Sequence, residues 1–95
     1  MEYANDGLWP DGTPVLVRFP RTKAEEQGSR EAWPWLPGTV LEQAGPDEWR
    51  VCVEVRELAV RLDGSRPTGR TPPHRLYYPC CYRDGSELRR RAPAG

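Results

Sequence analysis

The strongest constraint on the fold is a run of alternating side chains at residues 49–55. The apolar positions in this run are Trp49, Val51, Val53 and Val55. A period of two is typical of a β-strand with one face against a core. We therefore expect these four side chains to point inward, with Trp49 in the core and with Arg50 and Glu54 exposed.

The alternation continues after residue 56 with its phase reversed. The apolar positions become Leu58, Val60 and Leu62. A slip of one residue would turn the core face outward, so the chain has to absorb it at residues 56–57. A β-bulge or sharp bend does this. A tight turn between two strands and a helix over residues 55–62 are the alternatives.

Other stretches predict four more strands, at residues 15–19, 39–42, 76–82 and 86–90. The first has Val15, Val17 and Phe19 on one face. The cluster at residues 44–47 predicts a hairpin turn. Pro79 implies an edge strand or a bulge, and residues 86–90 could instead form one 3₁₀ turn. If Leu76, Tyr78 and Cys80 face inward, Tyr77 is exposed.

The segments between these strands read as loops. Residues 21–32 are polar and interrupted by Gly28, and residues 63–75 are rich in glycine, proline and arginine. With 9 glycines and 11 prolines in 95 residues, the chain is rich in turns and forms one domain. We expect an all-β fold of about five antiparallel strands curled into a small barrel. Residues 1–11 form an irregular lead-in, 12–91 the barrel and 92–95 a flexible tail.

Four motifs occur in the order found in one family of small barrels. They are Val15-Leu16-Val17, residues 35–40 (WLPGTV), residues 49–55, and Glu87-Leu88-Arg89. This order resembles the SH3-like barrel of the Tudor and Agenet type. The resemblance covers residues 12–91 and implies a binding domain. Members of this family often hold a methylated lysine or arginine in an aromatic cage, through cation–π attraction.

An aromatic rim is the first candidate binding surface. Its residues are Trp33, Trp35, Tyr77, Tyr78 and Tyr82. Glu31 or Glu42 could supply a negative charge beside it. We expect Trp35 to pack in the core and Trp33 to face a ligand. The alternative is that Trp35 and Trp49 are core and the tyrosines cover sheet edges with their hydroxyl groups in water.

A basic set is the second candidate surface. It comprises Arg66, Arg70, Arg75, Arg89 and Arg90, accompanied by His74 and Arg91. Arginines beside exposed aromatic rings suit single-stranded nucleic acid. Acids outnumber bases in residues 1–48 and bases outnumber acids in residues 49–95, while the net charge is zero. The two halves could neutralise each other, and the arginines could simply form a solvated loop and tail.

Catalytic and metal-binding signatures are missing from the sequence. The three cysteines, Cys52, Cys80 and Cys81, form no Cys-x-x-Cys pair, and His74 is the one histidine. His74 with Cys80 or Cys81 has no evident orienting partner. We expect reduced thiols, no disulfide, no metal and no cofactor in a cytoplasmic protein without a signal peptide or membrane span.

The sequence therefore predicts a small binding module that is not an enzyme. A protein or peptide bound through the aromatic rim is the preferred partner. Nucleic acid bound through residues 63–75 and the C-terminal arginines is the alternative.

Overall fold

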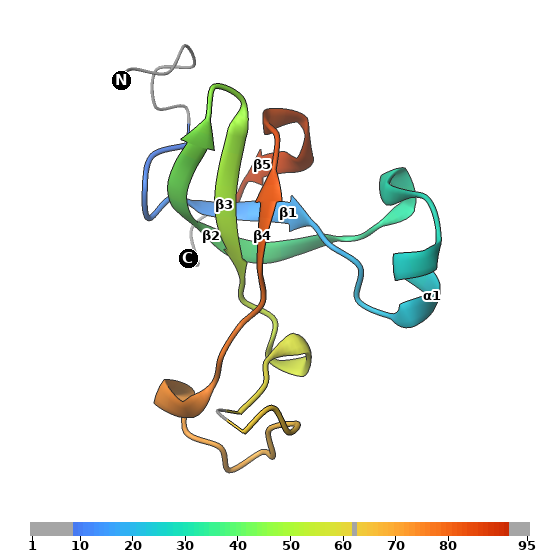
Figure 1. Cartoon of the computed structure of the whole chain (residues 1–95), viewed down its shortest axis with the longest axis vertical. Coiled ribbons are helices and arrows are strands. Elements are labelled where there is room, and N and C mark those ends of the chain that lie inside the picture. Colours follow the sequence, from blue (N-terminus) through green and yellow to red (C-terminus); the bar gives the residue numbers. More distant parts are fainter. Residues whose placement is uncertain (1–8, 62, 92–95) are drawn as a thin grey trace.

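The chain folds around one five-stranded antiparallel sheet, described here by a computed structural model that covers residues 9–61 and 63–91 (Figure 1). The strands are β1 (Pro14–Arg18), β2 (Trp35–Gly45), β3 (Glu48–Val53), β4 (Cys80–Arg83) and β5 (Leu88–Arg90). Their order is β4-β3-β2-β1-β5. Within the described residues β4 pairs only with β3 and β5 only with β1, so the sheet is not closed. The prediction of a mainly β chain is confirmed.

The third predicted strand is β3, and its alternation is confirmed. Trp49, Val51 and Val53 are buried, as is Val55 just after the strand. Glu54 is exposed, and the Arg50 side chain keeps 40% of its surface. A two-residue turn at positions 46–47 joins β2 to β3, which confirms the predicted hairpin.

β2 joins the two halves of the sheet and is longer than the predicted strand at 39–42. Its first part pairs with β1 and its later part with β3, and Gly38 and Thr39 pair with both. The register with β3 shifts twice, as happens where a strand bends. A Cβ atom at Gly38 would lie 2.5 Å from the Cys52 carbonyl oxygen, so this position accepts only glycine without a shift of backbone.

The core fills one face of the bent sheet. Its buried members are Trp9, Val15, Val17, Leu36, Val40, Trp49, Val51, Val53, Val55 and Leu88. Phe19 packs partly buried against them, which fits the predicted inner face of β1. Trp9 is only 8% exposed, so the core extends into the segment predicted as a lead-in. Residues 1–8 of that lead-in and the predicted tail at 92–95 lie outside the described residues.

A 3₁₀ turn, η2 (Arg56–Leu58), follows β3 where the apolar phase reverses. Such a turn rotates successive side chains by about 120°, so strict alternation ends there. The alternation after residue 56 does not form a regular strand over residues 58–61. Ala59 is buried, Val60 is 41% exposed, and a single bridge joins Val60 to Tyr77. Leu62 lies outside the described residues.

The segment predicted as a long loop at residues 21–32 contains two short helices, α1 (Lys23–Gln27) and η1 (Arg30–Ala32). Thr22 begins α1 with a capping box: its hydroxyl oxygen accepts from the Glu25 amide, and the Glu25 carboxylate accepts from the Thr22 amide. Gly28 ends the helix. The loop prediction is therefore wrong over α1, although its break at Gly28 is confirmed.

The last two strands, β4 and β5, both lie after Pro79 in the chain. β4 starts at Cys80 and is an edge strand, as the proline predicted. Of the predicted inward set, Leu76 is buried but Cys80 is exposed, because Cys80 lies opposite Cys52 on the outer face. Both alternatives for residues 86–90 occur in turn, as η4 (Gly85–Glu87) and then β5. No helix among the described residues is long and apolar enough to cross a membrane.

Candidate functional site

Trp33 lies just before β2 and is half-buried. Its indole Nε1 donates a hydrogen bond of 2.6 Å to the Glu25 carbonyl oxygen, which ties β2 to α1. The guanidinium carbons of Arg30 and Arg83 lie 5.2 and 5.6 Å from the centre of a Trp33 ring. The ring expected to face a ligand is therefore already in cation–π contact with two arginines of its own chain.

Arg83 is buried at the end of β4, with 9% of its surface exposed. Its Nε donates to the Arg18 carbonyl oxygen at 2.9 Å, and its Nη1 donates to the Tyr82 carbonyl oxygen at 2.7 Å. Its guanidinium also lies 5.7 Å from the Phe19 ring centre. No carboxylate of the described residues lies within 4.0 Å of it. Arg83 thus bridges β4 to the end of β1 through carbonyl groups and aromatic faces.

Trp35 faces outward, so its predicted place in the core is wrong. Leu36, the next residue of β2, takes the buried position, and neighbouring side chains of a strand point to opposite faces. The guanidinium carbons of Arg18 and Arg89 lie 4.5 and 3.9 Å from the Trp35 ring centre. Trp35 therefore lies on the outer face of the sheet, in contact with one arginine of β1 and one of β5.

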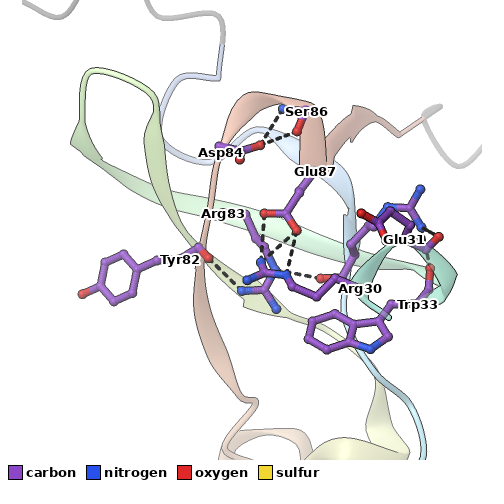
Figure 2. A network of polar contacts seen from close by, with 9 residues as sticks. Arg30, Glu31, Trp33, Tyr82, Arg83, Asp84, Ser86 and Glu87 are labelled. Atoms are coloured by element: carbon purple, nitrogen blue, oxygen red, sulfur yellow. Dashed lines mark hydrogen bonds and ion pairs between the residues drawn. The ribbon is translucent and has the colours of Figure 1, made fainter. Parts of the chain in front are cut away.

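A polar network lies beside Trp33 and Arg83 (Figure 2). Arg30 and Glu87 form an ion pair of 2.8 Å, with Arg30 Nε also donating to the carboxylate. Asp84 accepts hydrogen bonds from Ser86, and the Ser86 hydroxyl is the main cause that lowers the pKa of Asp84. The cleft of about 400 Å³ beside them is lined by Arg18, Arg30, Glu31, Asp84, Ser86 and Glu87. Its charges are mixed in sign, and Arg30 and Glu87 are paired with each other.

The two candidate carboxylates are placed apart from each other. Glu31 hydrogen-bonds the Ser29 hydroxyl, and this bond is the main cause that lowers the pKa of Glu31. Glu42, on β2, forms an ion pair of 3.8 Å with Arg50. Glu31 lines the cleft near Trp33. Among the described residues, Glu42 contacts neither Trp33 nor Trp35.

The three tyrosines of the predicted rim lie along the chain from residue 77 to β4. Tyr77 and Tyr82 are 50% and 54% exposed, and Tyr78 is half-buried. Tyr82 projects from β4 away from Trp33 (Figure 2). The rim is therefore not one cage: its tryptophans contact arginines of this chain, and its exposed tyrosines lie elsewhere. Ligand binding by these residues stays a prediction.

Two of the predicted arginines of residues 63–75, which we call the basic loop, line the same cleft. They are Arg70 and Arg75. This cleft of about 210 Å³ is lined by Arg61, Thr68, Arg70, Thr71, Pro72 and Arg75, and none of these described residues carries a carboxylate. We call it the three-arginine cleft. Arg66 lines a second cleft of about 310 Å³, with Arg56 and Glu57 among its other residues. Arg61 was missed because the sequence pattern placed it in a strand.

Arg56 of η2 fixes the conformation of the basic loop through hydrogen bonds to its backbone. Arg56 Nη2 donates to the carbonyl oxygens of Thr68 and Thr71, at 2.8 and 3.0 Å. The Thr71 hydroxyl accepts from the Thr68 amide at 2.9 Å. Sequence reasoning could not have found this role of Arg56, since the contacts depend on how the loop folds back.

The predicted arginines of β5 lie far from the basic loop. Figure 1 shows the loop at the lower end of the molecule and β5 at the upper end. Arg89 is packed on Trp35, and Arg90 is exposed. The predicted basic set is therefore two separate surfaces.

The three cysteines are free thiols on β3 and β4. Burial is the main cause that raises the pKa of Cys52 to about 11 and also raises the pKa of Cys81. No group of three or more histidine, cysteine or acidic side chains in the described part of the chain could hold a metal ion. Compared with protein-family models, curated proteins and solved structures, the chain matches none of them.

Proposed function

We propose that this protein is a non-catalytic binding module with an SH3-like barrel fold, and that its partner is a protein or peptide. The strand order β4-β3-β2-β1-β5 and the bent β2 support this fold. So does Arg83, which connects β4 to the end of β1 across the open side of the sheet. A role in the cytoplasm agrees with three free thiols.

The observation that carries the binding proposal is an exposed apolar pair at the base of the basic loop. Val60 and Tyr77 are bridge partners, and both are exposed. Arg61 follows Val60 in the chain, and Arg75 is two residues before Tyr77. Both arginines line the three-arginine cleft. An exposed ring beside guanidinium groups that form no ion pair with any described residue suits a peptide with an aromatic or aliphatic anchor and acidic residues next to it.

Two of the three cysteines, Cys52 and Cys81, support a non-catalytic role. A nucleophilic cysteine needs a lowered thiol pKa or an adjacent base. Here the pKa values of Cys52 and Cys81 are raised. His74 lies exposed in η3 (Pro73–Arg75), outside β3 and β4.

A titration of the ¹⁵N-labelled protein with pools of acidic peptides tests this proposal. Peptides should shift the amide signals of Val60, Arg61 and Tyr77. Tyr77→Ala should weaken binding about tenfold or more, as loss of an aromatic anchor does. Tyr82→Ala is the matched control, because Tyr82 is equally exposed but lies on β4. Equal losses in both variants, or no binding to any pool, would contradict the proposal.

Nucleic acid remains a second candidate because the three-arginine cleft has no carboxylate among its lining residues. Its affinity should fall steeply with salt as counterions are displaced from phosphates. Arg61→Ala and Arg70→Ala should each reduce that salt dependence, and Tyr77→Ala should matter less. Binding of this kind, in gel shifts at low and moderate salt, would replace the peptide proposal.

A further inference from the structure

Cys52 on β3 and Cys80 on β4 lie directly opposite each other in the antiparallel ladder. The amide of Val53 donates to the carbonyl oxygen of Pro79 at 2.8 Å. That bond places the two cysteines at a non-hydrogen-bonded position, where opposite Cα atoms are about 4.5 Å apart and side chains are closest. Disulfides accept Cα separations of about 4.4–6.8 Å. The backbone is therefore already spaced for a bond between these residues.

The two thiols also share a face of the sheet. Cys80 is exposed and Cys52 is half-buried. Cys80 is one of the nearby groups that raise the pKa of Cys52, which agrees with their direct pairing in the ladder. Cys81 is excluded from this pair because it lies opposite Val51 and packs against the core on the other face.

We propose that Cys52 and Cys80 form a reversible disulfide across β3 and β4 when a low-molecular-weight disulfide, such as oxidised glutathione, is the oxidant. The bond would join the edge strand covalently to its neighbour. It would also close a ring around residues 53–79, which include the basic loop. This inference does not depend on the proposed binding function.

The reaction takes two exchange steps. The thiolate of the exposed Cys80 attacks one sulfur of oxidised glutathione, breaks its S–S bond and releases one glutathione thiolate. The Cys52 thiolate then attacks the Cys80 sulfur of the mixed disulfide and releases the second glutathione thiolate. Each cysteine loses one proton, each released thiolate takes one up, and two electrons pass from the cysteine sulfurs to oxidised glutathione.

The second step should be the slower one. Burial holds Cys52 as a thiol, and the nearby Cys80, Glu54 and Cys81 act in the same direction on its pKa. Thr39, which lies opposite Cys52 on β2, carries no charge. The rate of ring closure should therefore rise by up to about tenfold per pH unit between pH 7 and pH 9, as the thiolate fraction grows.

Equilibration of the full chain with mixtures of reduced and oxidised glutathione tests the proposal. Samples are quenched in acid, the free thiols are alkylated, and peptides are mapped by mass spectrometry. Wild type and Cys81→Ala should each give one intramolecular bond between residues 52 and 80. Cys80→Ala is the matched variant at the neighbouring position and should give no intramolecular bond. Melting of the reduced variants checks that each is folded.

Several results would overturn the proposal. One is a bond between Cys80 and Cys81. Another is wild-type protein that ends as glutathione adducts or as linked dimers. The third is thiols that stay reduced at the highest ratio of oxidised to reduced glutathione. The oxidised wild type should also melt about 5 °C or more above the reduced protein, since the ring restricts the unfolded chain. An unchanged or lower melting temperature would show that the ladder does not accommodate the bond.

Discussion

At the scale of single residues, the buried Arg83 holds separate parts of the chain together. A buried guanidinium group loses its hydration, and partners have to replace it. Arg83 finds them in two carbonyl oxygens and in the faces of Phe19 and Trp33. It therefore joins β4 to β1 and to the segment that leads into β2.

Arg83→Ala should lower the free energy of unfolding by about 2–4 kcal/mol, because it leaves two carbonyl groups without their donor and opens a cavity beside two rings. Urea unfolding measures the change. Arg90→Ala is the control, since Arg90 is exposed on β5, and its effect should stay within about 0.5 kcal/mol. Arg83→Lys should recover little, because an ammonium group cannot reach both carbonyls in a planar fork. Equal midpoints for Arg83→Ala and Arg90→Ala would refute this role.

Gly38→Ala should destabilise the protein by about 2 kcal/mol or more, since the new methyl group meets backbone rather than a movable side chain. Gly69→Ala offers a control with the same chemical change, because a Cβ atom there meets nothing within 4 Å. Thermal melting of the two variants should show a clear loss for the first and almost none for the second. A small effect at Gly38 would mean that β2 and β3 can move apart.

At the scale of elements, patterns within a single strand were readable from the sequence. The alternation at residues 49–55 correctly predicted the buried face of β3. The same logic could have placed Trp35, because Leu36, Gly38 and Val40 alternate inward and leave Trp35 outside. The Thr22–Glu25 pair, a capping-box pattern, could have predicted α1.

Other features could not be read from the sequence, because they depend on contacts between distant segments. The three-arginine cleft forms only when Arg61 meets the far side of the basic loop. Arg83 is buried only because Arg18 and Trp33 come to it from other elements. Patterns within a short stretch of sequence do not predict such contacts.

Thr22→Ala should weaken the start of α1 by about 1 kcal/mol, since the Glu25 amide loses its acceptor. The effect should be local: hydrogen exchange of the Glu25 amide should become about fivefold faster while global melting hardly changes. Ser29→Ala is the control, because the Ser29 hydroxyl bonds the Glu31 carboxylate and caps neither helix, so the Glu25 amide should be unaffected. A matching change in global stability would mean that α1 is integral to the core.

At the scale of the whole molecule, the ion pairs of the described residues match few acids of residues 1–48 with bases of residues 49–95. Four ion pairs occur among the described residues: Arg21–Glu57, Arg30–Glu87, Arg50–Glu42 and Arg91–Glu54. Of these four, only Arg50–Glu42 joins a base of residues 49–95 to an acid of residues 1–48. The arginines of the basic loop form no ion pair in the described chain, so the loop keeps its positive charge.

Stability should fall at alkaline pH partly through Cys52. Its pKa is raised from 9.0 to about 11 in the folded protein, chiefly by burial, so the native state keeps a proton that the unfolded chain has lost. This contribution is complete below about pH 9 and is lost as pH rises toward 11. Melting temperatures between pH 8 and pH 11 should therefore fall more steeply in wild type than in Cys52→Ala. Parallel curves would show that the Cys52 thiol titrates as it does in the unfolded chain.

The pairing of β1 with β5 has a consequence for the rate of folding. Val15 meets Arg90 and Val17 meets Leu88, so these strands can pair only after almost the whole chain has been brought together. The β2–β3 hairpin closes over two residues and can form within about 1–10 μs. Sheets dominated by distant pairings instead fold in milliseconds to seconds, because loop-closure entropy is lost before the contacts compensate for it. Stopped-flow refolding, followed by a tryptophan fluorescence signal to which the buried Trp49 contributes, should give a main phase in that slower range. We expect β5 to join the sheet late in folding, so Leu88→Ala should speed unfolding more than it slows folding.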